Sequence, residues 1–387
     1  MSARAFVLSL STAFVFTAFG CDSDNGDDAN GNGQSTDDVN NNASWLERID
    51  TPESDYKPSE LETVINDIVS ELNKTDKNAT MKLAFVPKDL ADYFETTILG
   101  ANHAFRELSV VSNIVAPTPG DDEYTEEVAL AQQIEIVDKQ TANGINGLGL
   151  APHNDSLIPS VDAAIDAGAT VITFDTDIPD SKRQLYVGTM NAEAGKTSGE
   201  TMVSLLEGET GTVIILGNDN AVWIDGYDRT HEARKVIEEA GNTVVIRQTT
   251  WADLESDGVF IAETIDTADP PVVGCLGVFS NSHYCAWGAE QAGAIDDIKV
   301  AAFDFESETL EYMEAGKIQV THAQRQYYMG YLIPYLLYAA NVLGLEETKT
   351  LAADLMVDDE RIDTGLDIIY ADKVDEYNQF LDDLGVL

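Results

Sequence analysis

Basic residues are scarce in this chain of 387 residues. Lysine and arginine together number 22 against 69 aspartates and glutamates, which gives a formal net charge of -47. Phosphate backbones and anionic membrane surfaces repel so acidic a chain, so nucleic acid is excluded as a partner. The same excess suits a surface kept hydrated in high salt, where screening shortens the repulsion between like charges.

Histidine is almost as rare, and the common catalytic motifs are missing. The five histidines are His103, His153, His231, His283 and His322. Their scatter along the chain argues against a metal site, and we expect no cofactor. No strand opens into G-x-G-x-x-G or a P-loop, no G-x-S-x-G elbow occurs, and His231-Glu232 lacks the second histidine of a zinc helix. The sequence therefore gives little support to an enzyme.

Long apolar runs are also missing, apart from one at the amino terminus. Residues 5–19 form a largely apolar stretch that follows Arg4 and ends in Gly20 before Cys21. A stretch of about 15 residues is short for a membrane span and has the length of a secretory signal core. We therefore expect residues 1–20 to be a signal peptide and the mature protein to be exported.

The chain has only three cysteines. Residues 18–21 resemble a bacterial lipobox, although Ala18 and Phe19 depart from its usual leucine and small residue. This resemblance implies that Cys21 is lipidated and anchors the mature chain, with a plain cleaved signal as the alternative. Cys275 and Cys285 are ten residues apart. An oxidising compartment would let them pair, but the turn between them leaves a disulfide and two free thiols both open.

Apolar residues nearly vanish after the expected signal. Residues 22–44 consist mainly of Asp, Asn, Gly and Ser, which cannot bury enough surface to offset the entropy of ordering. We predict that residues 21–57 form the anchor cysteine and a disordered acidic linker. Residues 58–79 then form an appendage, because apolar side chains recur at helical spacing from Leu61 to Leu72 before a polar stretch.

From residue 80 onward, short apolar runs alternate with helix-length runs. The strand-like runs are 82–86, 110–115, 145–150 and 170–174, and then 212–216, 243–247, 272–279 and 299–303. Strands that alternate with helices predict a parallel sheet covered on both faces. Because there are two such series, we predict an α/β protein of two similar lobes, each with a doubly wound parallel sheet.

Five short motifs follow one another along this pattern. They are VITFD at 171–175, DGY at 225–227, VAAFD at 300–304, QRQYYMG at 324–330 and DTG at 363–365. In order and spacing they resemble the periplasmic sugar-binding proteins of the ribose and galactose type, the type I solute-binding proteins of ABC importers. The resemblance covers about residues 82–377.

The resemblance implies how the chain divides into lobes. It assigns residues 80–189 and 325–365 to an N-lobe, and residues 190–324 and 366–387 to a C-lobe. The chain then crosses between the lobes three times, and the crossings form a three-strand hinge. The hinge residues implied are Gly188, Asn191, Gln324 and Gly365. Closure about such a hinge buries a ligand between the two sheets.

Ligands of open α/β sheets bind at the carboxyl ends of the strands, where the pattern places aromatic and polar side chains. The candidate ligand-binding residues are Lys88, Tyr93, Phe94, Asp175, Trp223, Trp251, His283, Asp304 and Gln324. Aromatic rings beside polar groups suit a sugar, whose ring faces are apolar and whose rim carries hydroxyls. Each candidate also has a structural alternative. Asp175 would cap the next turn and His283 a helix, the aromatic rings would pack in the core, Asp304 would accept hydrogen bonds from loop amides, and Gln324 would have a structural role at the crossing.

Two positions depart from the pattern of the ribose binders. There an arginine commonly follows the strand-end aspartate, and another lies three residues before the glycine that Gly226 matches. Here Thr176 and Trp223 occupy these positions. With two guanidinium groups lost, the particular sugar cannot be carried over. A cleft of rings and carboxylates with fewer cations would also suit a cationic amine or vitamin.

The resemblance implies an exported, monomeric solute-binding protein without enzymatic activity. It would capture a small neutral ligand, with a monosaccharide favoured, and deliver it to an ABC permease. Its location would be periplasmic or at the cell surface, held to the membrane by the lipid anchor. Two alternatives remain open, a ligand-sensing module of a membrane receptor and a binder of a cationic amine.

Overall fold

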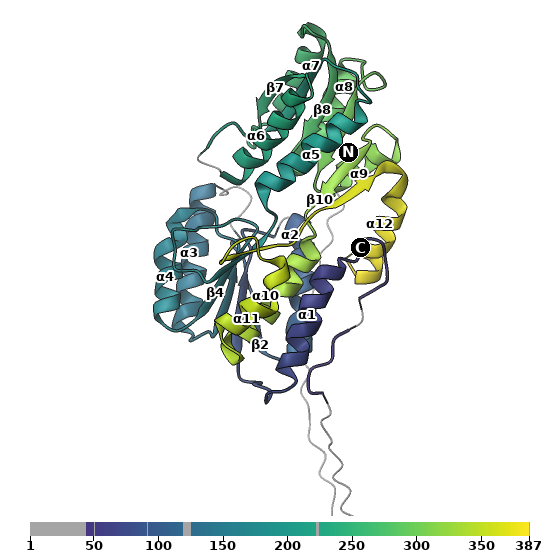
Figure 1. Ribbon diagram of the computed structural model, residues 1–387. Helices are drawn as coiled ribbons and strands as arrows, with labels where there is room; N and C mark the ends of the chain where they lie inside the picture. The colour runs from purple at the N-terminus through teal and green to yellow at the C-terminus, as the bar shows by residue number, and fades with distance from the viewer. Residues whose placement is uncertain (1–43, 50, 91, 119–124, 222–223, 387) are drawn as a thin grey trace, which may run out of the picture. The chain divides into compact units, whose positions relative to one another are not determined.

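The computed structural model of the protein describes residues 44–49, 51–90, 92–118, 125–221 and 224–386. The expected signal peptide, Cys21 and the linker up to residue 43 lie outside the described residues. From Ser44 onward the chain forms two six-stranded sheets with helices packed against them (Figure 1). No helix in the described ranges has the length and apolar character needed to cross a bilayer.

The first sheet is parallel throughout and has the strand order β2-β1-β3-β4-β5-β11. Its strands are β1 (Lys82–Val86), β2 (Val111–Ile114), β3 (Gly147–Leu150), β4 (Thr170–Phe174), β5 (Leu185–Gly188) and β11 (Arg361–Asp363). Its helices are α2 (Asp92–Leu108), α3 (Glu126–Ala142), α4 (Ile158–Asp166), α10 (Gln326–Val342) and α11 (Leu345–Leu351), with the short turns η1 (Asp155–Leu157) and η3 (Ala353–Leu355). We call this sheet and its helices the first lobe.

The second sheet has the order β12-β10-β9-β8-β6-β7, and only β12 runs antiparallel to its neighbour among these strands. Its strands are β6 (Thr212–Gly217), β7 (Thr243–Gln248), β8 (Val272–Gly277), β9 (Lys299–Phe303), β10 (Val320–Ala323) and β12 (Asp367–Tyr370). Its helices are α5 (Asn191–Leu205), α6 (Ile224–Glu239), α7 (Glu255–Thr267), α8 (His283–Gln291), α9 (Ser307–Glu314) and α12 (Val374–Leu384), with the turns η2 (Ser280–Ser282) and η4 (Ala371–Lys373). We call this sheet and its helices the second lobe.

Burial explains why these runs are strands. Every residue of β3, β6 and β8 is buried, which is the pattern of parallel strands covered on both faces. In the first lobe, one face packs Phe85, Ile172 and Phe174 against α2 and α10, and the other packs Leu148 and Val171 against α3 and α4. The strands therefore hold their carboxyl ends in a fixed row at one edge of each sheet.

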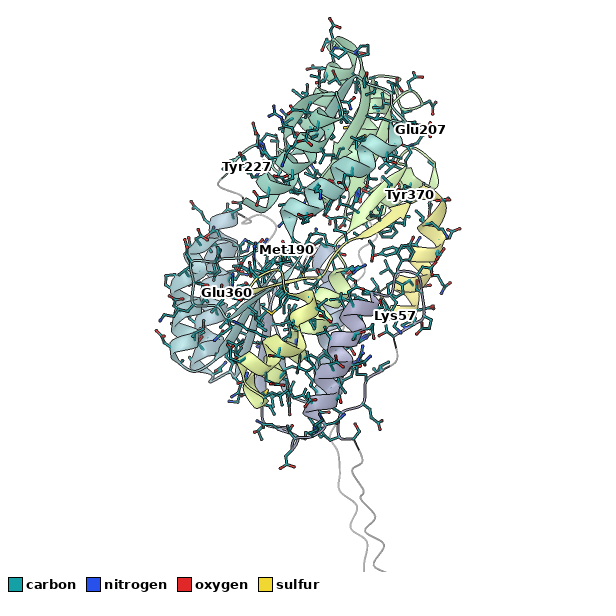
Figure 2. The ribbon with its side chains drawn as sticks, in the orientation of Figure 1. Lys57, Met190, Glu207, Tyr227, Glu360 and Tyr370 are labelled. Atoms are coloured by element: carbon teal, nitrogen blue, oxygen red, sulfur yellow. The ribbon has the colours of Figure 1, made fainter. Side chains whose placement is uncertain are left out.

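The chain passes between the lobes at three places. The first crossing joins β5 to α5, the second joins β10 to α10, and the third joins β11 to β12. Figure 2 labels Met190 at the first crossing. The backbone amide of Thr364 donates to the carbonyl of Gly188 at 3.1 Å, and Arg325 donates to the carbonyl of Thr364 at 3.2 Å. Hydrogen bonds thus link the third crossing to each of the other two.

The predicted fold class is confirmed, with one departure and one error. The departure is the antiparallel strand β12. The error concerns residues 44–57, which we expected to belong to a disordered linker. Leu46 is only 1% exposed, and the indole Nε1 of Trp45 donates to the carbonyl of Leu72 at 3.0 Å at the end of α1 (Ser59–Leu72). Two large apolar residues are enough to dock a segment whose overall composition is polar.

Cys275 on β8 and Cys285 on α8 are both buried and both free thiols. Of the two alternatives left open by the sequence, the structure has the unpaired one. Burial raises the pKa of the Cys275 thiol well above its usual value, so the thiol stays protonated and packs as a small apolar side chain.

Candidate ligand-binding site

A cavity of about 500 Å³ lies where strands of both sheets end, and we call it the ligand cavity. It is lined by Lys88, Asp89, Tyr93, Phe94, Glu126, His153, Asp175, Thr176, Arg229, Trp251, Phe279, Ser280, Asp304 and Gln324. The residues up to Thr176 belong to the first lobe, and those from Arg229 onward belong to the second. Both lobes therefore supply walls of one cavity, whose volume suits a small ligand.

Asp175 directly follows β4, and both oxygens of its carboxylate accept hydrogen bonds from the first lobe. The Nζ of Lys88 donates to Oδ2 at 2.8 Å, and the hydroxyl of Tyr93 donates to Oδ1 at 2.9 Å. Lys88 also donates to the hydroxyl of Thr176. Burial and the neighbouring carboxylate hold the pKa of Tyr93 well above its usual value, so this hydroxyl remains a donor. These contacts fix the carboxylate at the cavity wall.

Asp304 directly follows β9 and is the counterpart of Asp175 in the second lobe. It is 4% exposed, and the Nε2 of Gln324 donates to its Oδ1 at 2.7 Å. Burial raises the pKa of Asp304 to about 6, although Arg229 and Gln324 act in the opposite direction. Asp175 also raises this pKa, because two carboxylates that face one cavity repel each other.

The two aspartates share an unusual backbone conformation. Asp175 has φ 60° and Asp304 has φ 63°, which is the left-handed region that residues other than glycine mostly avoid. Aspartate tolerates this region better than most residues, but the conformation still costs free energy. The same backbone conformation occurs at the same place in both lobes, and both aspartates line the cavity. Each lobe therefore presents one carboxylate to the shared cavity.

Arg229 on α6 also lines the cavity, and the sequence analysis missed it. Its Nη1 donates to the carbonyl of Val278 at 2.8 Å, and its Nη2 donates to Asn191 at 2.5 Å and to Gln324 at 3.2 Å. The guanidinium carbon lies 4.1 Å from the centroid of the Phe303 ring. A planar cation held on an aromatic face and by three acceptors is fixed in one orientation.

The position of Arg229 corrects one expectation. We looked for an arginine three residues before Gly226 and found Trp223, which lies outside the described residues. Arg229 lies three residues after Gly226, nearly one turn further along α6, and brings a guanidinium to the cavity from there. The expectation that the cavity has lost both guanidinium groups is therefore wrong. Helical spacing around Gly226 was the signal that could have found it.

Aromatic rings form the rest of the wall. Tyr93 and Phe94 meet edge to face with centroids 5.0 Å apart, and Phe94 packs in turn on Phe174 of β4. Trp251 lies 5.8 Å from Phe279 and is 47% exposed, so it forms an accessible rim. A half-exposed tryptophan at a cavity mouth is available to cover an apolar ligand face.

Seven of the predicted ligand residues line the cavity, namely Lys88, Tyr93, Phe94, Asp175, Trp251, Asp304 and Gln324. The structure does not bring His283 to it. After β8 the chain turns through η2, so Ser280 meets the cavity and His283 begins α8 beyond it. The half-buried ring of His283 lies 4.4 Å from that of Tyr284, and desolvation lowers its pKa, which favours the neutral ring.

The predicted hinge residues lie at the crossings. Gly188 ends β5, and a Cβ there would come within 2.5 Å of the hydroxyl of Tyr186. Gly365 adopts φ 72°, which needs glycine, and its amide donates to Oδ1 of Asp363 at 2.8 Å. Asn191 and Gln324 both accept hydrogen bonds from Arg229. Movement at these four residues stays a prediction.

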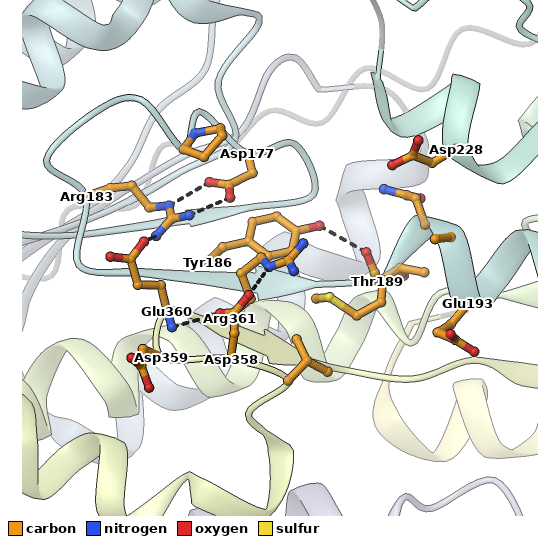
Figure 3. Close-up of a pocket in the computed structure, with 15 residues that line it drawn as sticks. Asp177, Arg183, Tyr186, Thr189, Glu193, Asp228, Asp358, Asp359, Glu360 and Arg361 are labelled. Carbon is orange, nitrogen blue, oxygen red and sulfur yellow. Dashed lines mark hydrogen bonds and ion pairs between the residues drawn. The ribbon is translucent and has the colours of Figure 1, made fainter.

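A second cavity of about 830 Å³ lies beside the first crossing (Figure 3). Arg183 there is already bound by Asp177 at 2.6 Å and by Glu360 at 2.8 Å, and Arg361 is bound by Asp358 at 2.7 Å. Its lining has six carboxylates among neutral residues, and among the described lining residues Tyr186 is the one aromatic ring. This cavity is larger, but the ligand cavity combines strand ends, aromatic rings and charges of both signs.

No group of three or more potential metal ligands occurs in the described part of the chain.

Residues 83–344 of the chain match the family model described as "Periplasmic binding protein domain". The chain belongs to this family. The matched residues include β2 to β10, β1 from Leu83 onward and all lining residues of the ligand cavity. The family resemblance seen in the sequence is thereby confirmed, and membership implies a location outside the cytoplasm. No curated protein matches the chain significantly.

Solved structures similar to this periplasmic binding protein share its fold. An ABC transporter solute-binding protein from Burkholderia graminis in complex with D-arabinose is 27% identical, with a TM-score of 0.63, over 77% of this chain and 98% of that one. An arabinose-binding protein from Geobacillus stearothermophilus is 23% identical, with a TM-score of 0.64, over 77% and 99%. A periplasmic ribose ABC transporter protein from Conexibacter woesei is 20% identical, with a TM-score of 0.63, over 79% and 96%.

Proposed function

We propose that this periplasmic binding protein captures a monosaccharide in the ligand cavity and delivers it to an ABC permease without making or breaking a bond. The observation that carries the proposal is the pair of carboxylates, Asp175 and Asp304, held by opposite lobes beside a fixed guanidinium and aromatic rings. Carboxylates accept from sugar hydroxyls, the guanidinium donates to them, and the rings cover the apolar C–H faces.

The charges at the cavity favour a neutral ligand over a cationic one. Lys88 faces Asp175 in an ion pair at 2.8 Å, and Arg229 lies close enough to Asp304 to lower its pKa. Each carboxylate thus has a cation beside it, and an amine would meet both attraction and repulsion. Hydrogen bonds to charged groups contribute about 1.5–3 kcal/mol each and ring contacts about 0.5–1.5 kcal/mol. A handful of them reaches the roughly -8 kcal/mol of micromolar binding.

The mechanism is a shift between open and closed arrangements of the lobes. A sugar that touches Asp175 in the first lobe and Asp304 in the second binds the closed arrangement more tightly than the open one. The closed population rises by that difference in affinity, and the crossings absorb the motion. The permease would recognise the closed form.

We further propose that the exported chain is anchored by a lipid on Cys21 and works as a monomer. The support is the apolar stretch of residues 5–19, the lipobox-like sequence before Cys21 and the polar linker after it. Mass spectrometry of the mature amino terminus tests the anchor. A lipid-modified Cys21 is expected, and an unmodified amino terminus would contradict it.

A thermal-shift screen tests the ligand class. D-Arabinose, D-allose, polyols and amines are added to the purified protein, and a ligand at 100 times its dissociation constant stabilises the fold by about 2.7 kcal/mol. We expect the sugars to raise the melting temperature and the amines to leave it unchanged. A response to amines alone would show the proposal to be wrong.

A pair of aromatic substitutions tests the site. Trp251→Ala removes the exposed ring at the cavity and should weaken sugar binding about fivefold, because a ring contact contributes about 1 kcal/mol. Tyr370→Ala is the control, since Tyr370 is a similarly exposed aromatic residue on β12, away from the cavity lining. Calorimetric titration measures both affinities, and equal losses would contradict the assignment of the site.

A further inference from the structure

The segment before the family-matched residues lies against both lobes. We call residues 51–60 the strap; it runs from the docked amino-terminal segment into the first turn of α1. The first lobe holds α1 firmly, because Leu61, Ile65 and Ile68 are fully buried in the core that includes α10. The hydroxyl of Thr51 donates to Glu62 of α1 at 2.9 Å, which ties the start of the strap to the same helix.

The strap reaches the second lobe through Tyr56. Its ring meets Tyr377 of α12 edge to face, with centroids 4.9 Å apart, and Tyr377 meets Phe305 in the same way at 4.8 Å. Phe305 directly follows Asp304, the buried carboxylate of the ligand cavity. Figure 2 shows Lys57, the next residue of the strap, beside α12. A row of three rings thus connects the strap to the loop that carries Asp304.

The strap reaches the second crossing through Glu60. The carboxylate of Glu60 pairs with Nη1 of Arg325 at 2.6 Å, and Nε of Arg325 pairs with Asp367 at the third crossing at 2.7 Å. Arg325 has φ 55°, a left-handed conformation that an arginine adopts only when its surroundings hold it there. Arg325 directly follows Gln324, which donates to Asp304.

We propose that Tyr56 and Glu60 are positioning residues for ligand capture, and that the strap holds the two lobes in the arrangement that turns Asp304 and Gln324 toward the first lobe. Neither residue touches the ligand cavity, and both precede the family-matched residues. Each supports the chain neighbour of a cavity residue, Phe305 in one case and Arg325 in the other. The proposal rests on the proposed sugar binding only for its affinity measurement.

The strap affects affinity through the population of the binding-competent arrangement. When that population falls, the apparent dissociation constant rises in the same proportion. A half-exposed ion pair such as that of Glu60 contributes little free energy to holding the lobes together, and the ring pair of Tyr56 and Tyr377 contributes more. We therefore expect the double variant Tyr56→Ala/Glu60→Gln to bind sugar about three- to tenfold more weakly, and the ligand-free lobes to sample a wider range of separations.

The test measures the lobe separation directly and does not require the ligand. Spin labels are placed on cysteines introduced at exposed Lys139 of α3 and exposed Glu239 of α6, in a chain with Cys21→Ser. Pulsed electron–electron double resonance then gives the distribution of distances between the two spin labels, and so between the lobes. The double variant should show a broader distribution, shifted to longer distances, than the same labelled chain with its strap intact.

Two controls separate positioning from general loss of structure. Glu53→Gln weakens the pair that Glu53 makes with Lys57 inside the strap; the Glu53 side chain is 91% exposed, so the change should leave distances and affinity unchanged. Tyr56→Phe keeps the ring and should behave as the native chain. An unchanged distance distribution in the double variant overturns the proposal, whether or not a sugar has been found. Failure of native protein to bind any sugar would instead contradict only the proposed function.

Discussion

At the residue scale, the site depends on side chains that burial and partners have fixed before a ligand arrives. Asp175 and Asp304 could be predicted, because each directly follows an apolar strand and the carboxyl ends of parallel strands share one edge. Arg229 was missed, because a strand pattern does not specify which face a following helix turns to the cavity, and only the helical spacing around Gly226 pointed to it. The Lys88–Asp175 pair joins residues 87 positions apart, and no local pattern reports such a contact.

The pH dependence of stability tests the burial of Asp304. Its folded pKa of about 6 lies above the ordinary 3.8, so the folded state holds a proton that the unfolded state releases between these values. The contribution of this group is fully present below about pH 4 and is lost as pH rises through 6. The shift corresponds to a loss of about 3 kcal/mol.

Asp304→Asn removes this dependence. We expect the variant, relative to the native protein, to gain about 3 kcal/mol in free energy of unfolding between pH 4 and pH 7. Urea titrations at several pH values measure the difference, and the comparison cancels the titration of the other carboxylates. A difference that stays constant across this range would contradict the burial of an ionisable group at this position.

At the element scale, the alternation of strands and helices was predictable because apolar periodicity is local, and it placed β1 to β4 and β6 to β9 within a few residues. All three crossings came only from the family resemblance, and the order of the strands within each sheet was not predicted. The docked segment from Ser44 to residue 57 was missed, because two apolar residues in a polar stretch leave no periodic signal. Contact between distant helices was equally invisible in the sequence.

The contact between α2 and α10 shows what such packing demands. A Cβ on Gly330 would lie 1.8 Å from the carbonyl oxygen of Thr97, and one on Gly100 would lie 2.1 Å from that of Tyr327. In a free helix Gly→Ala stabilises by about 1 kcal/mol. Here Gly330→Ala should instead lower the free energy of unfolding by about 1–3 kcal/mol, because the helices must separate.

Chemical denaturation measures this effect, and Gly330→Ser should cost at least as much as Gly330→Ala. The sign of the change in free energy of unfolding decides between the two effects, since helix propensity favours alanine at this position and packing against α2 disfavours it. An alanine variant more stable than the native protein would show that the two helices do not approach so closely.

At the scale of the whole molecule, charge is the dominant feature. With a net charge of -47, the folded protein repels itself, and salt shortens the range of that repulsion from about 30 Å at 0.01 M to about 3 Å at 1 M. We expect the melting temperature to rise steadily over this range of sodium chloride. An equal osmolality of sucrose is the control for general solvent effects, and a melting temperature that salt leaves flat would contradict the expectation.

The interleaving of the lobes has a consequence for synthesis. Helix α10 and strand β11 belong to the first lobe but come after the whole series of strands β6 to β10. A nascent chain that has left the ribosome only as far as residue 189 therefore exposes the face of β3 and β4 that α10 will cover. We therefore expect the part of the chain up to residue 189 to be insoluble when it is expressed alone, because it lacks the helix that covers this face of its sheet.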